Sequence, residues 1–363
     1  MDPTRVAVIG CGAIANGGHL PAYRAAAAAG LCRLVGVCDI DRERAQQSAD
    51  QYGVKPFERA ADLLAQTRPE VVSITTFPAS HRDLALLAFD AGCHVLCEKP
   101  VALHYGEAAA MVRAAARAQR LLSVCFQYRY WDESVYLKEH IAALGPLHAV
   151  RTWGGNAHCF PTSPGYHRQA SAGGGALAHW TIHNLDLILW LLGYPEPLRA
   201  SAFCHQRLAR YPAALGPALS HLQPADIEAS IEDFAMGLVR LAGDTVVTVE
   251  ANFLQPPSDR REGWEFLGAR GAAAIAPLRL WLDEGDVWIE RTPPPGALAP
   301  CDYGMERLIA AFLKAVRQGD RAPVASAEIL CLQRLVDALY ASSRCGREVA
   351  VEKMHTEGED TDA

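Results

Sequence analysis

Two histidines and an aspartate stand at helical spacing in the segment GGGALAHWTIHNLD, residues 173–186. Because a helix has about 3.6 residues per turn, His179, His183 and Asp186 fall on nearly one face and can address one site. Such a set suits a zinc ion with an open coordination position, a proton-transfer site, or polar packing on a buried helix. The segment lacks the glutamate of a His-Glu-x-x-His motif, so we predict no metal. Asp186 either orients His183 or belongs to the packing of the helix.

A glycine-rich turn near the start of the chain is a second candidate site. The apolar run of VAVIGCGAIA, residues 6–15, leads into Gly10-x-Gly12-x-x-Ala15 and then into helix-compatible sequence. In dinucleotide-binding turns the first glycine permits the tight bend, the second lets the backbone approach a pyrophosphate, and a small third residue allows close packing. The free N–H groups of the following helix would hold the phosphates. The predicted cofactor-binding turn comprises Gly10, Cys11, Gly12, Ala13, Ile14 and Ala15.

Asp39 ends the second apolar run and indicates which dinucleotide is bound. A carboxylate at this place accepts hydrogen bonds from the adenosine ribose hydroxyls and repels a 2'-phosphate, so NAD is favoured over NADP. Arg42 weakens this preference, because it either pairs with a phosphate or lies along the adenine. The alternative role for Asp39 is to cap a turn.

The elements that must position these residues form two patterns along the chain. Up to about residue 125, short β-branched runs alternate with alanine-rich helical stretches, which predicts a parallel sheet with helical crossovers. The runs are residues 5–10, 34–39, 71–75, 94–97 and 122–126. After Tyr130, strand-like runs follow one another with fewer helices between them. This second pattern predicts an α+β domain on a mostly antiparallel sheet.

The strands expected in this second part are residues 149–153, 234–241 and 245–251, and the helices are 173–192, 305–317 and 327–343. The predicted fold class is therefore α/β, with an N-terminal Rossmann domain and a C-terminal α+β domain. We place the dinucleotide-binding domain at 1–126, the substrate-binding and oligomerisation domain at 127–351, and a disordered acidic tail at 352–363.

Composition excludes several classes of function. The chain has 363 residues and a formal net charge of -7, with no basic face for nucleic acid. No apolar run reaches the roughly 18 residues that span a bilayer, and the N-terminus lacks the features of a signal peptide. Eleven cysteines without a CxxC pair favour reduced thiols. We expect a cytoplasmic protein whose partner is a small molecule, rather than nucleic acid or a membrane.

Four segments together resemble one family. They are GCGAIANGGHLPAY at 10–23, VVSITTFPASHRDLALLAFDAGCHVLCEKP at 71–100, CFQYRY at 125–130, and the glycine-rich helix that opens at 173. In this order they are similar to the glucose-fructose oxidoreductase and inositol dehydrogenase (Gfo/Idh/MocA) family. The resemblance implies a Rossmann domain followed by a domain with a large open sheet that commonly mediates oligomerisation, so we expect a homodimer or homotetramer. It also implies hydride transfer between a nicotinamide and a hydroxyl-bearing carbon of a sugar or cyclic polyol.

The same resemblance implies roles for individual residues. Lys99 would contact the reacting oxygen and His183 would handle its proton, which fits the need of alcohol oxidation for a cation and a base. His179 stands where the family usually has an aspartate, so a titratable imidazole replaces a fixed anion. Further expected cofactor contacts are Thr75, Thr76, His81, Glu98 and Lys99, with Gln127 near the nicotinamide. Expected substrate contacts are Lys99, Arg129, Trp153, His158, Tyr166, Arg168, His179 and His183.

The leading prediction is an NAD-dependent dehydrogenase that oxidises a secondary hydroxyl of a cyclic polyol, sugar or nucleotide-linked sugar. One alternative keeps the fold and works in the opposite direction, as a reductase of a keto-sugar in a biosynthetic pathway. A second alternative, motivated by the missing aspartate at position 179, is a non-catalytic dinucleotide-binding sensor. A third is zinc-dependent hydrolysis on the helix histidines.

Overall fold

A computed structural model describes residues 2–155, 165–206, 230–253, 262–285, 287–298 and 304–352. The chain divides into two compact units. The first unit comprises Met1–Asp132 and Ala299–Ile329, and the second comprises Glu133–Leu298 and Leu330–Ala363. Across the described residues, we find no helix that combines the length and the apolar character needed to cross a membrane.

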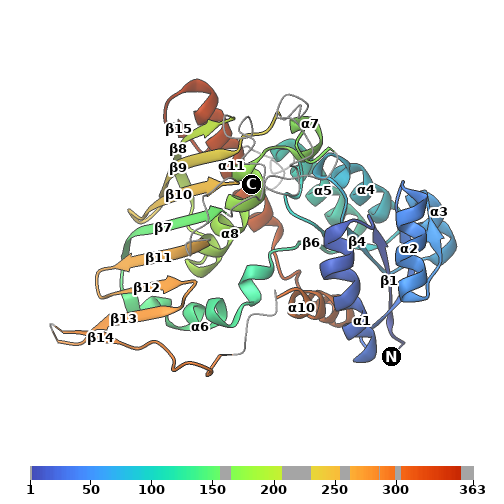
Figure 1. Cartoon of the computed structure of the whole chain (residues 1–363), viewed down its shortest axis with the longest axis horizontal. Helices are drawn as coiled ribbons and strands as arrows, with labels where there is room; N and C mark the ends of the chain where they lie inside the picture. The colour runs from blue at the N-terminus through green and yellow to red at the C-terminus, as the bar shows by residue number, and fades with distance from the viewer. Residues whose placement is uncertain are drawn as a thin grey trace, which may run out of the picture. The chain divides into compact units, whose positions relative to one another are not determined.

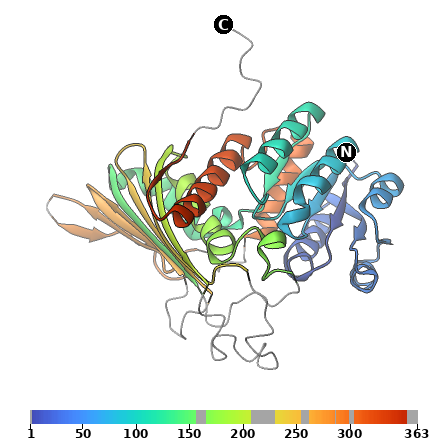
Figure 2. The same cartoon turned by 90° about the horizontal axis from the view of Figure 1, so that it is seen from above.

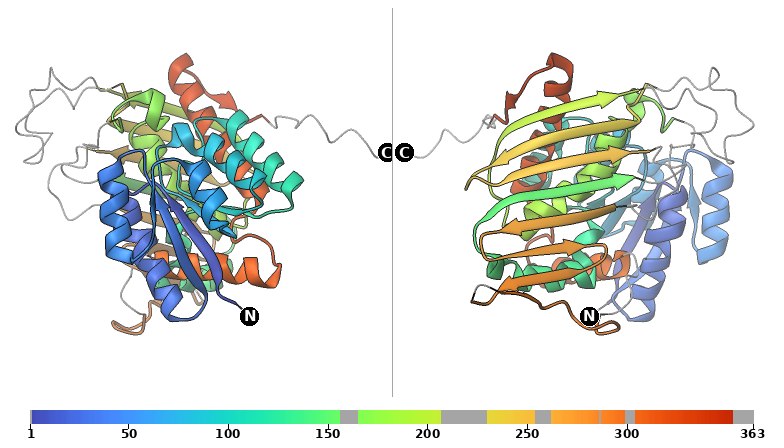
Figure 3. Two further views of the ribbon diagram at one scale, coloured as in Figure 1. Left: turned by 90° about the vertical axis from the view of Figure 1, so that its right-hand side faces the viewer. Right: turned by 60° about the vertical axis from the view of Figure 1, so that its left-hand side comes forward.

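The first unit is built on a six-stranded parallel sheet in the order β3-β2-β1-β4-β5-β6. Figure 1 labels β1, β4 and β6 of this sheet. The strands are β1 (Thr4–Ile9), β2 (Cys32–Cys38), β3 (Pro56–Phe57), β4 (Val71–Ile74), β5 (His94–Cys97) and β6 (Leu122–Val124). Their β-branched residues suit strands that are covered on both faces, and helices lie on both sides of this sheet (Figure 3). The strand order is that of a doubly wound dinucleotide-binding fold, as the sequence predicted.

Local signals explain where the helices of this unit begin and end. They are η1 (Ala15–His19), α1 (Leu20–Ala28), α2 (Arg42–Tyr52), α3 (Ala60–Thr67), α4 (Pro78–Asp90), α5 (Tyr105–Ala118) and η2 (Gln127–Tyr130). Asp41 caps α2, because its carboxylate accepts hydrogen bonds from the Glu43 and Arg44 N–H groups, and the helix ends at Gly53 with φ of 66°. Pro78 occupies the first position of α4, where its missing N–H has no cost.

One late helix belongs to the first unit, although the predicted second domain, 127–351, includes it. In α10 (Met305–Gln318), Met305, Leu308 and Phe312 are buried in the same apolar cluster as Leu20 and Tyr23 of α1. The chain returns to the first unit at α10 because the apolar face of this helix is covered by the first sheet and its helices. The amphipathic pattern predicted the helix but does not specify which core it joins.

The second unit contains a nine-stranded mixed sheet in the order β14-β13-β12-β11-β7-β10-β9-β8-β15. Its strands are β7 (Leu147–Gly155), β8 (Pro197–His205), β9 (Phe234–Leu241), β10 (Val246–Asn252), β11 (Glu262–Gly268), β12 (Gly271–Ile275), β13 (Arg279–Asp283), β14 (Trp288–Glu290) and β15 (Val349–Ala350). Among the described strands of this sheet, only β7 and β10 pair in parallel, so the predicted mostly antiparallel sheet is confirmed.

Helices cover one face of this sheet (Figure 2). They include α6 (Asp132–His140), η3 (Ile141–Leu144), α7 (Gln169–Ala172), η4 (Leu177–Thr181), α8 (Ile182–Leu191) and α11 (Ser326–Cys345). Hydrogen bonds fasten α11 to β8, since the Ser342 and Ser343 hydroxyls accept from the Ala202 and Cys204 N–H groups. In the part of the chain that the structure describes, no helix covers the opposite face (Figures 2 and 3). Of the predicted acidic tail, only Glu352 lies within the described residues.

Candidate active site

The predicted cofactor residues of the first unit follow the carboxyl ends of adjacent parallel strands. Gly10–Gly12 follow β1, Asp39 follows β2, Thr75 and Thr76 follow β4, Glu98 and Lys99 follow β5, and Gln127 stands shortly after β6. Carboxyl ends of parallel strands meet at one edge of a sheet, and the strand order reverses here between β1 and β4. Dinucleotides bind at such a reversal in doubly wound sheets.

The two glycines of the turn are required for different reasons. Gly10 has φ of 101°, and a Cβ atom there would lie 2.7 Å from the backbone carbonyl of Thr75. The Thr75 hydroxyl also donates a hydrogen bond to the Gly10 carbonyl oxygen at 2.7 Å, so the two segments are held close together. A Cβ atom on Gly12, in contrast, would have no other atom within 4 Å. The fold therefore needs Gly10, whereas the open space over Gly12 fits a pyrophosphate that approaches the backbone.

Asp39 connects the turn to the segment after β2. Its Oδ2 accepts a hydrogen bond from the Cys11 N–H at 2.7 Å, and its Oδ1 accepts one from the Asp41 N–H at 2.9 Å. Asp39 thus braces a local turn and also fixes an anionic group beside the glycine-rich turn. Arg42 is largely exposed, and its guanidinium lies 3.6 Å from Glu58. Together with the open backbone at Gly12, the anionic Asp39 fits the donors of an NAD ribose.

Lys99 is half-buried at the end of β5, and its peptide bond to Pro100 is cis. The Lys99 N–H donates to Glu98 Oε2 at 3.0 Å. Burial lowers the pKa of Lys99, and the Glu98 carboxylate opposes this effect. Burial alone would raise the pKa of Glu98, but the hydrogen bond and charge of His19, with the charge of Lys99, hold it below its ordinary value. The pair therefore keeps a carboxylate beside the lysine at the edge where the glycine-rich turn lies.

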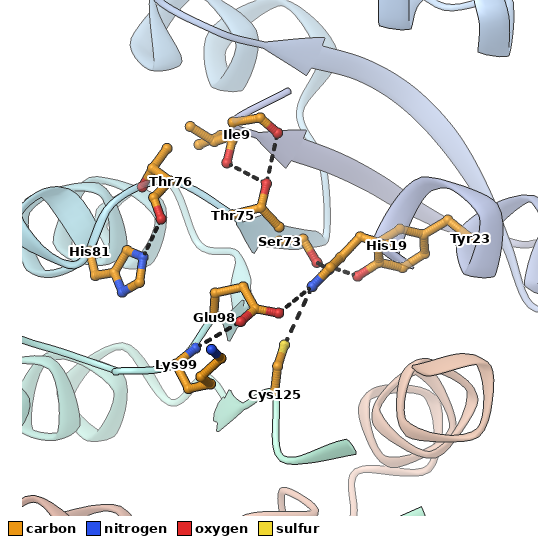
Figure 4. Close-up of polar contacts among 11 residues, drawn as sticks. Ile9, His19, Tyr23, Ser73, Thr75, Thr76, His81, Glu98, Lys99 and Cys125 are labelled. Atoms are coloured by element: carbon orange, nitrogen blue, oxygen red, sulfur yellow. Dashed lines mark hydrogen bonds and ion pairs between the residues drawn. The ribbon is translucent and has the colours of Figure 1, made fainter. Parts of the chain in front are cut away.

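A buried polar chain behind Glu98 was not predicted. His19 Nε2 lies 3.0 Å from Glu98 Oε1, His19 Nδ1 lies 3.1 Å from the Ser73 Oγ, and the Tyr23 hydroxyl lies 2.7 Å from the same Ser73 Oγ (Figure 4). His19, Ser73 and Tyr23 are at most 1% exposed. The available signal was the pair of polar residues four positions apart, His19 and Tyr23, in the helical run that follows the glycine-rich turn. Nothing in the sequence indicated that Ser73 joins them.

Three of these neighbouring groups also have the chemistry of metal ligands. The candidate donor atoms of His19, Glu98 and Cys125 lie within 4.8 Å of one another. The hydrogen bond between His19 and Glu98 accounts for their approach, and the positive charge of Lys99 opposes a second cation beside the same carboxylate. We therefore assign these atoms to a hydrogen-bonded cluster.

Other predicted residues of this unit connect its segments. His81 is fully buried, with Nδ1 2.9 Å from the Pro100 carbonyl oxygen and Nε2 3.0 Å from that of Thr76. It thereby ties the segments after β4 and β5 to α4. Arg129 is 4% exposed, and its guanidinium donates to Glu328 at 2.9 Å. This ion pair gives Arg129 a structural contact within the unit.

The glycine-rich segment of the second unit is built around Glu232. The Gly175 and Leu177 N–H groups donate to its two carboxylate oxygens at 2.8 and 2.9 Å. Tyr340 of α11 donates to Oε1 at 2.7 Å. A Cβ atom on Gly175 would lie 1.8 Å from the Glu232 carbonyl oxygen, and one on Gly174 would lie 1.9 Å from the Tyr340 hydroxyl. Sequence analysis missed both Glu232 and Tyr340.

The two histidines of this segment are buried at the start of the helix. His179 lies in the π-helical turn η4 and His183 in the first turn of α8, and they are 5% and 6% exposed. The Tyr166 ring lies 4.6 Å from the His179 ring between centroids. Asp186 accepts a hydrogen bond from the Tyr194 hydroxyl at 2.7 Å. This contact gives one carboxylate oxygen of Asp186 a partner on the segment that follows the helix.

The remaining predicted substrate residues lie in different surroundings. Trp153 is half-buried on β7, and its ring would lie 2.3 Å from a Cβ on Gly263, so the glycine makes room for it. Arg168 is exposed and directly precedes α7. His158 lies outside the described residues.

Comparison with known proteins identifies the family. The description "Oxidoreductase family, NAD-binding Rossmann fold" matches residues 4–126, and "GFO/IDH/MocA C-terminal domain" matches residues 135–274. The chain is 28% identical over 353 residues to the D-glucoside 3-dehydrogenase of Escherichia coli (strain K12), covering 96% of this chain and 97% of that protein.

Solved structures have the same fold. An oxidoreductase domain protein from Kribbella flavida gives a TM-score of 0.85 at 22% identity, over 97% of this chain and 100% of that one. Levoglucosan dehydrogenase, in complex with NADH and L-sorbose, gives a TM-score of 0.83 at 23% identity, over 98% of this chain and 100% of that one. The chain belongs to the Gfo/Idh/MocA family of oxidoreductases, and its first unit has the NAD-binding Rossmann fold of that family.

Proposed function

We propose that this protein is an NAD-dependent dehydrogenase that oxidises a secondary hydroxyl of a cyclic polyol, a sugar or a nucleotide-linked sugar. The observation that carries the proposal is the half-buried Lys99, held beside the Glu98 carboxylate at the sheet edge that also bears the glycine-rich turn. Relatives with assigned activities, such as the D-glucoside 3-dehydrogenase and levoglucosan dehydrogenase, are named as sugar dehydrogenases. This supports the substrate class.

Lys99 and His183 supply the two groups that alcohol oxidation needs. Bound NAD would supply the hydride acceptor. The Lys99 ammonium donates a hydrogen bond to the substrate oxygen and stabilises the negative charge that develops on it. His183 accepts the hydroxyl proton, for which an imidazole with a pKa near neutrality is suited. His179, one turn earlier, presents its ring beside Tyr166, and both side chains would contact the sugar.

NAD is proposed over NADP because of Asp39. Its carboxylate is fixed by the Cys11 and Asp41 N–H groups and cannot turn away from a bound ribose without losing both hydrogen bonds. A 2'-phosphate at that place would meet a fixed anion. The exposed Arg42, paired with Glu58, leaves this preference in place.

We also propose that the protein is a cytoplasmic homodimer or homotetramer. On β9, Gly237 faces α11, since a Cβ there would lie 3.2 Å from Leu339, so the adjacent Met236 faces the opposite side. Met236 pairs with Phe203 of β8, and these two side chains are 49% and 56% exposed. An apolar pair on an open sheet face supports an interface with a second copy. Light scattering on the wild type and on Phe203→Glu tests this interface.

The described cysteines are free thiols, which supports a reducing compartment.

The direct test is turnover. Purified protein is incubated with NAD and a panel of polyols, sugars and nucleotide-linked sugars, and NADH is followed by its absorbance. We expect oxidation of at least one member, loss of at least about a hundredfold in kcat for Lys99→Met and for His183→Asn, and wild-type rates for the exposed control His104→Gln. Tight NAD binding without turnover of any member, in either direction, would instead support a dinucleotide-binding sensor.

A further inference from the structure

We propose that His19 is a positioning residue for Lys99, and that it acts through the carboxylate of Glu98 (Figure 4). The inference rests on the proposed function, in which Lys99 contacts the reacting oxygen. It concerns a residue outside the turn and the helix that carry the predicted catalytic groups.

The hydrogen bonds behind Glu98 have one consistent direction. A carboxylate only accepts, so His19 Nε2 must donate to Glu98 Oε1 across the 3.0 Å between them. In the neutral imidazole, Nδ1 then accepts from the Ser73 hydroxyl, and Ser73 Oγ accepts from the Tyr23 hydroxyl. Every donor in this series of hydrogen bonds has an acceptor, and the last acceptor is Glu98. Burial raises the pKa of Tyr23 well above its ordinary value, which keeps the phenol a donor at the start of the chain.

The second oxygen of the same carboxylate fixes the lysine. Glu98 Oε2 accepts from the Lys99 N–H at 3.0 Å, so Glu98 joins the His19 chain to the backbone of Lys99. Because all of His19 and nearly all of Glu98 are buried, loss of the imidazole would leave Oε1 with one fewer donor and no solvent to replace it. The carboxylate could then turn or take up a proton. Either change would weaken its effect on the direction and the charge of Lys99.

The other ionisable groups around this pair supply no charge to Glu98. Burial lowers the pKa of His81 and raises the pKa values of Cys97 and Cys125, so all three are neutral near neutral pH. Within the described residues of the first unit, the interactions that lower the pKa of Glu98 are therefore those with His19 and with Lys99. Removal of His19 favours the protonated form of Glu98, and the pKa of Lys99 falls with the loss of that anion.

The test compares His19→Leu, which cannot donate, with His19→Gln, whose amide can still donate to Glu98. The matched control is His104→Gln, the same substitution at a histidine whose side chain is 61% exposed. The first readout does not need turnover: the protein without NAD is acylated across the neutral to alkaline range, and the Lys99 peptide is quantified by mass spectrometry. The second readout is the pH profile of kcat, and the third is the Kd for NAD.

We expect His19→Leu to lower the pH at which Lys99 begins to react and to move the alkaline limb of kcat to lower pH. We also expect kcat near neutrality to fall between about tenfold and about a hundredfold, with the Kd for NAD changed by less than about twofold. His19→Gln should recover most of kcat and the wild-type labelling curve. If His19→Leu does not fold, His19→Asn replaces it, because this shorter amide does not reach Glu98.

A folded His19→Leu or His19→Asn protein with unchanged labelling of Lys99 and unchanged kcat would overturn the inference. Stoichiometric metal in the wild type that is lost with His19 would also overturn it, since the cluster would then be a ligand set. If no substrate is found, the labelling curves still decide the role of His19, so failure of the proposed function is distinguished from failure of this inference.

Discussion

The Tyr340 hydroxyl donates a hydrogen bond to Glu232 Oε1 across 2.7 Å, although the two residues are 108 positions apart in the sequence. The same carboxylate accepts the N–H groups of Gly175 and Leu177, which open the helical segment that bears His179 and His183. Helix starts have N–H groups without intrahelical partners, and here one side chain satisfies two of them. The orientation of the two histidines therefore depends on a contact that α11 completes.

We predict that Tyr340→Phe lowers the free energy of unfolding by about 1 to 3 kcal/mol, because a buried carboxylate loses one of its donors. Urea unfolding measures this cost. In the enzyme, kcat should fall while the Kd for NAD stays at its wild-type value, since the change is confined to the second unit. The control is Tyr136→Phe, which removes a hydroxyl that donates to the Arg291 carbonyl in a more exposed setting. Equal effects of the two substitutions on kcat would contradict the positioning role.

A pH dependence of stability follows from Glu232. Burial raises the pKa of Glu232 above its ordinary value, although its hydrogen bonds to Tyr340 and to backbone N–H groups oppose the shift. The folded state therefore holds this proton more tightly than the unfolded state. Its contribution to stability is fully present below the unfolded pKa and is lost as the pH rises through the folded pKa. We expect the unfolding free energy of the wild type, relative to that of Glu232→Gln, to fall as the pH rises through this window and to be constant above it. A difference that moves in the opposite direction with pH would contradict the raised pKa.

Substitution of the two glycines of the turn should affect different properties, stability at Gly10 and cofactor binding at Gly12. Gly10→Ala places a Cβ 2.7 Å from the Thr75 backbone at a φ of 101°, so we expect a loss of at least about 2 kcal/mol in unfolding free energy. Gly12→Ala meets no atom within 4 Å and should change stability by less than about 0.5 kcal/mol. It should nevertheless raise the Kd for NAD at least about tenfold, or about 1.4 kcal/mol, because the methyl group enters the space open to the pyrophosphate. Thermal unfolding and NAD titration of both variants check this. Normal NAD affinity in Gly12→Ala would place the pyrophosphate elsewhere.

The first sheet and its edge residues could be predicted from the sequence because they depend on local signals. β-Branched runs mark the strands, and the residue after each run comes to the same edge once the strands are parallel. In this way Gly10 and Asp39 could be identified before their contacts were known, whereas Thr75, Glu98 and Lys99 were indicated by the resemblance to the family. The second sheet was predicted less completely. β12 has the sequence GAAAI, and alanine does not favour strands, so its pairing with β11 and β13 is decided by tertiary packing.

The groups that support the proposed catalytic residues could not be predicted, because each combines distant segments. His19 meets Ser73 and Glu98 only after three parallel strands are aligned, and Glu232 meets Tyr340 only after α11 packs on the second sheet. A polar residue on an apolar helix signals that a buried partner exists without saying which one. Likewise, the amphipathic face of α10 predicts burial but not the unit that buries it.

Asp39→Asn should change the preference for the cofactor. The amide keeps one oxygen, so either the Cys11 N–H or the Asp41 N–H retains its acceptor, but the fixed negative charge is lost. We expect the Kd for NAD to rise and the Kd for NADP to fall, so that their ratio shifts by about tenfold or more, which is about 1.4 kcal/mol. The matched control is Asp41→Asn, since asparagine also caps helices well and Asp41 binds the Glu43 and Arg44 N–H groups of α2 instead of the glycine-rich turn. Titration of each variant with both dinucleotides measures the ratio. A ratio that moves equally in the two variants would show that general charge at this edge, rather than the carboxylate bound to Cys11, selects NAD.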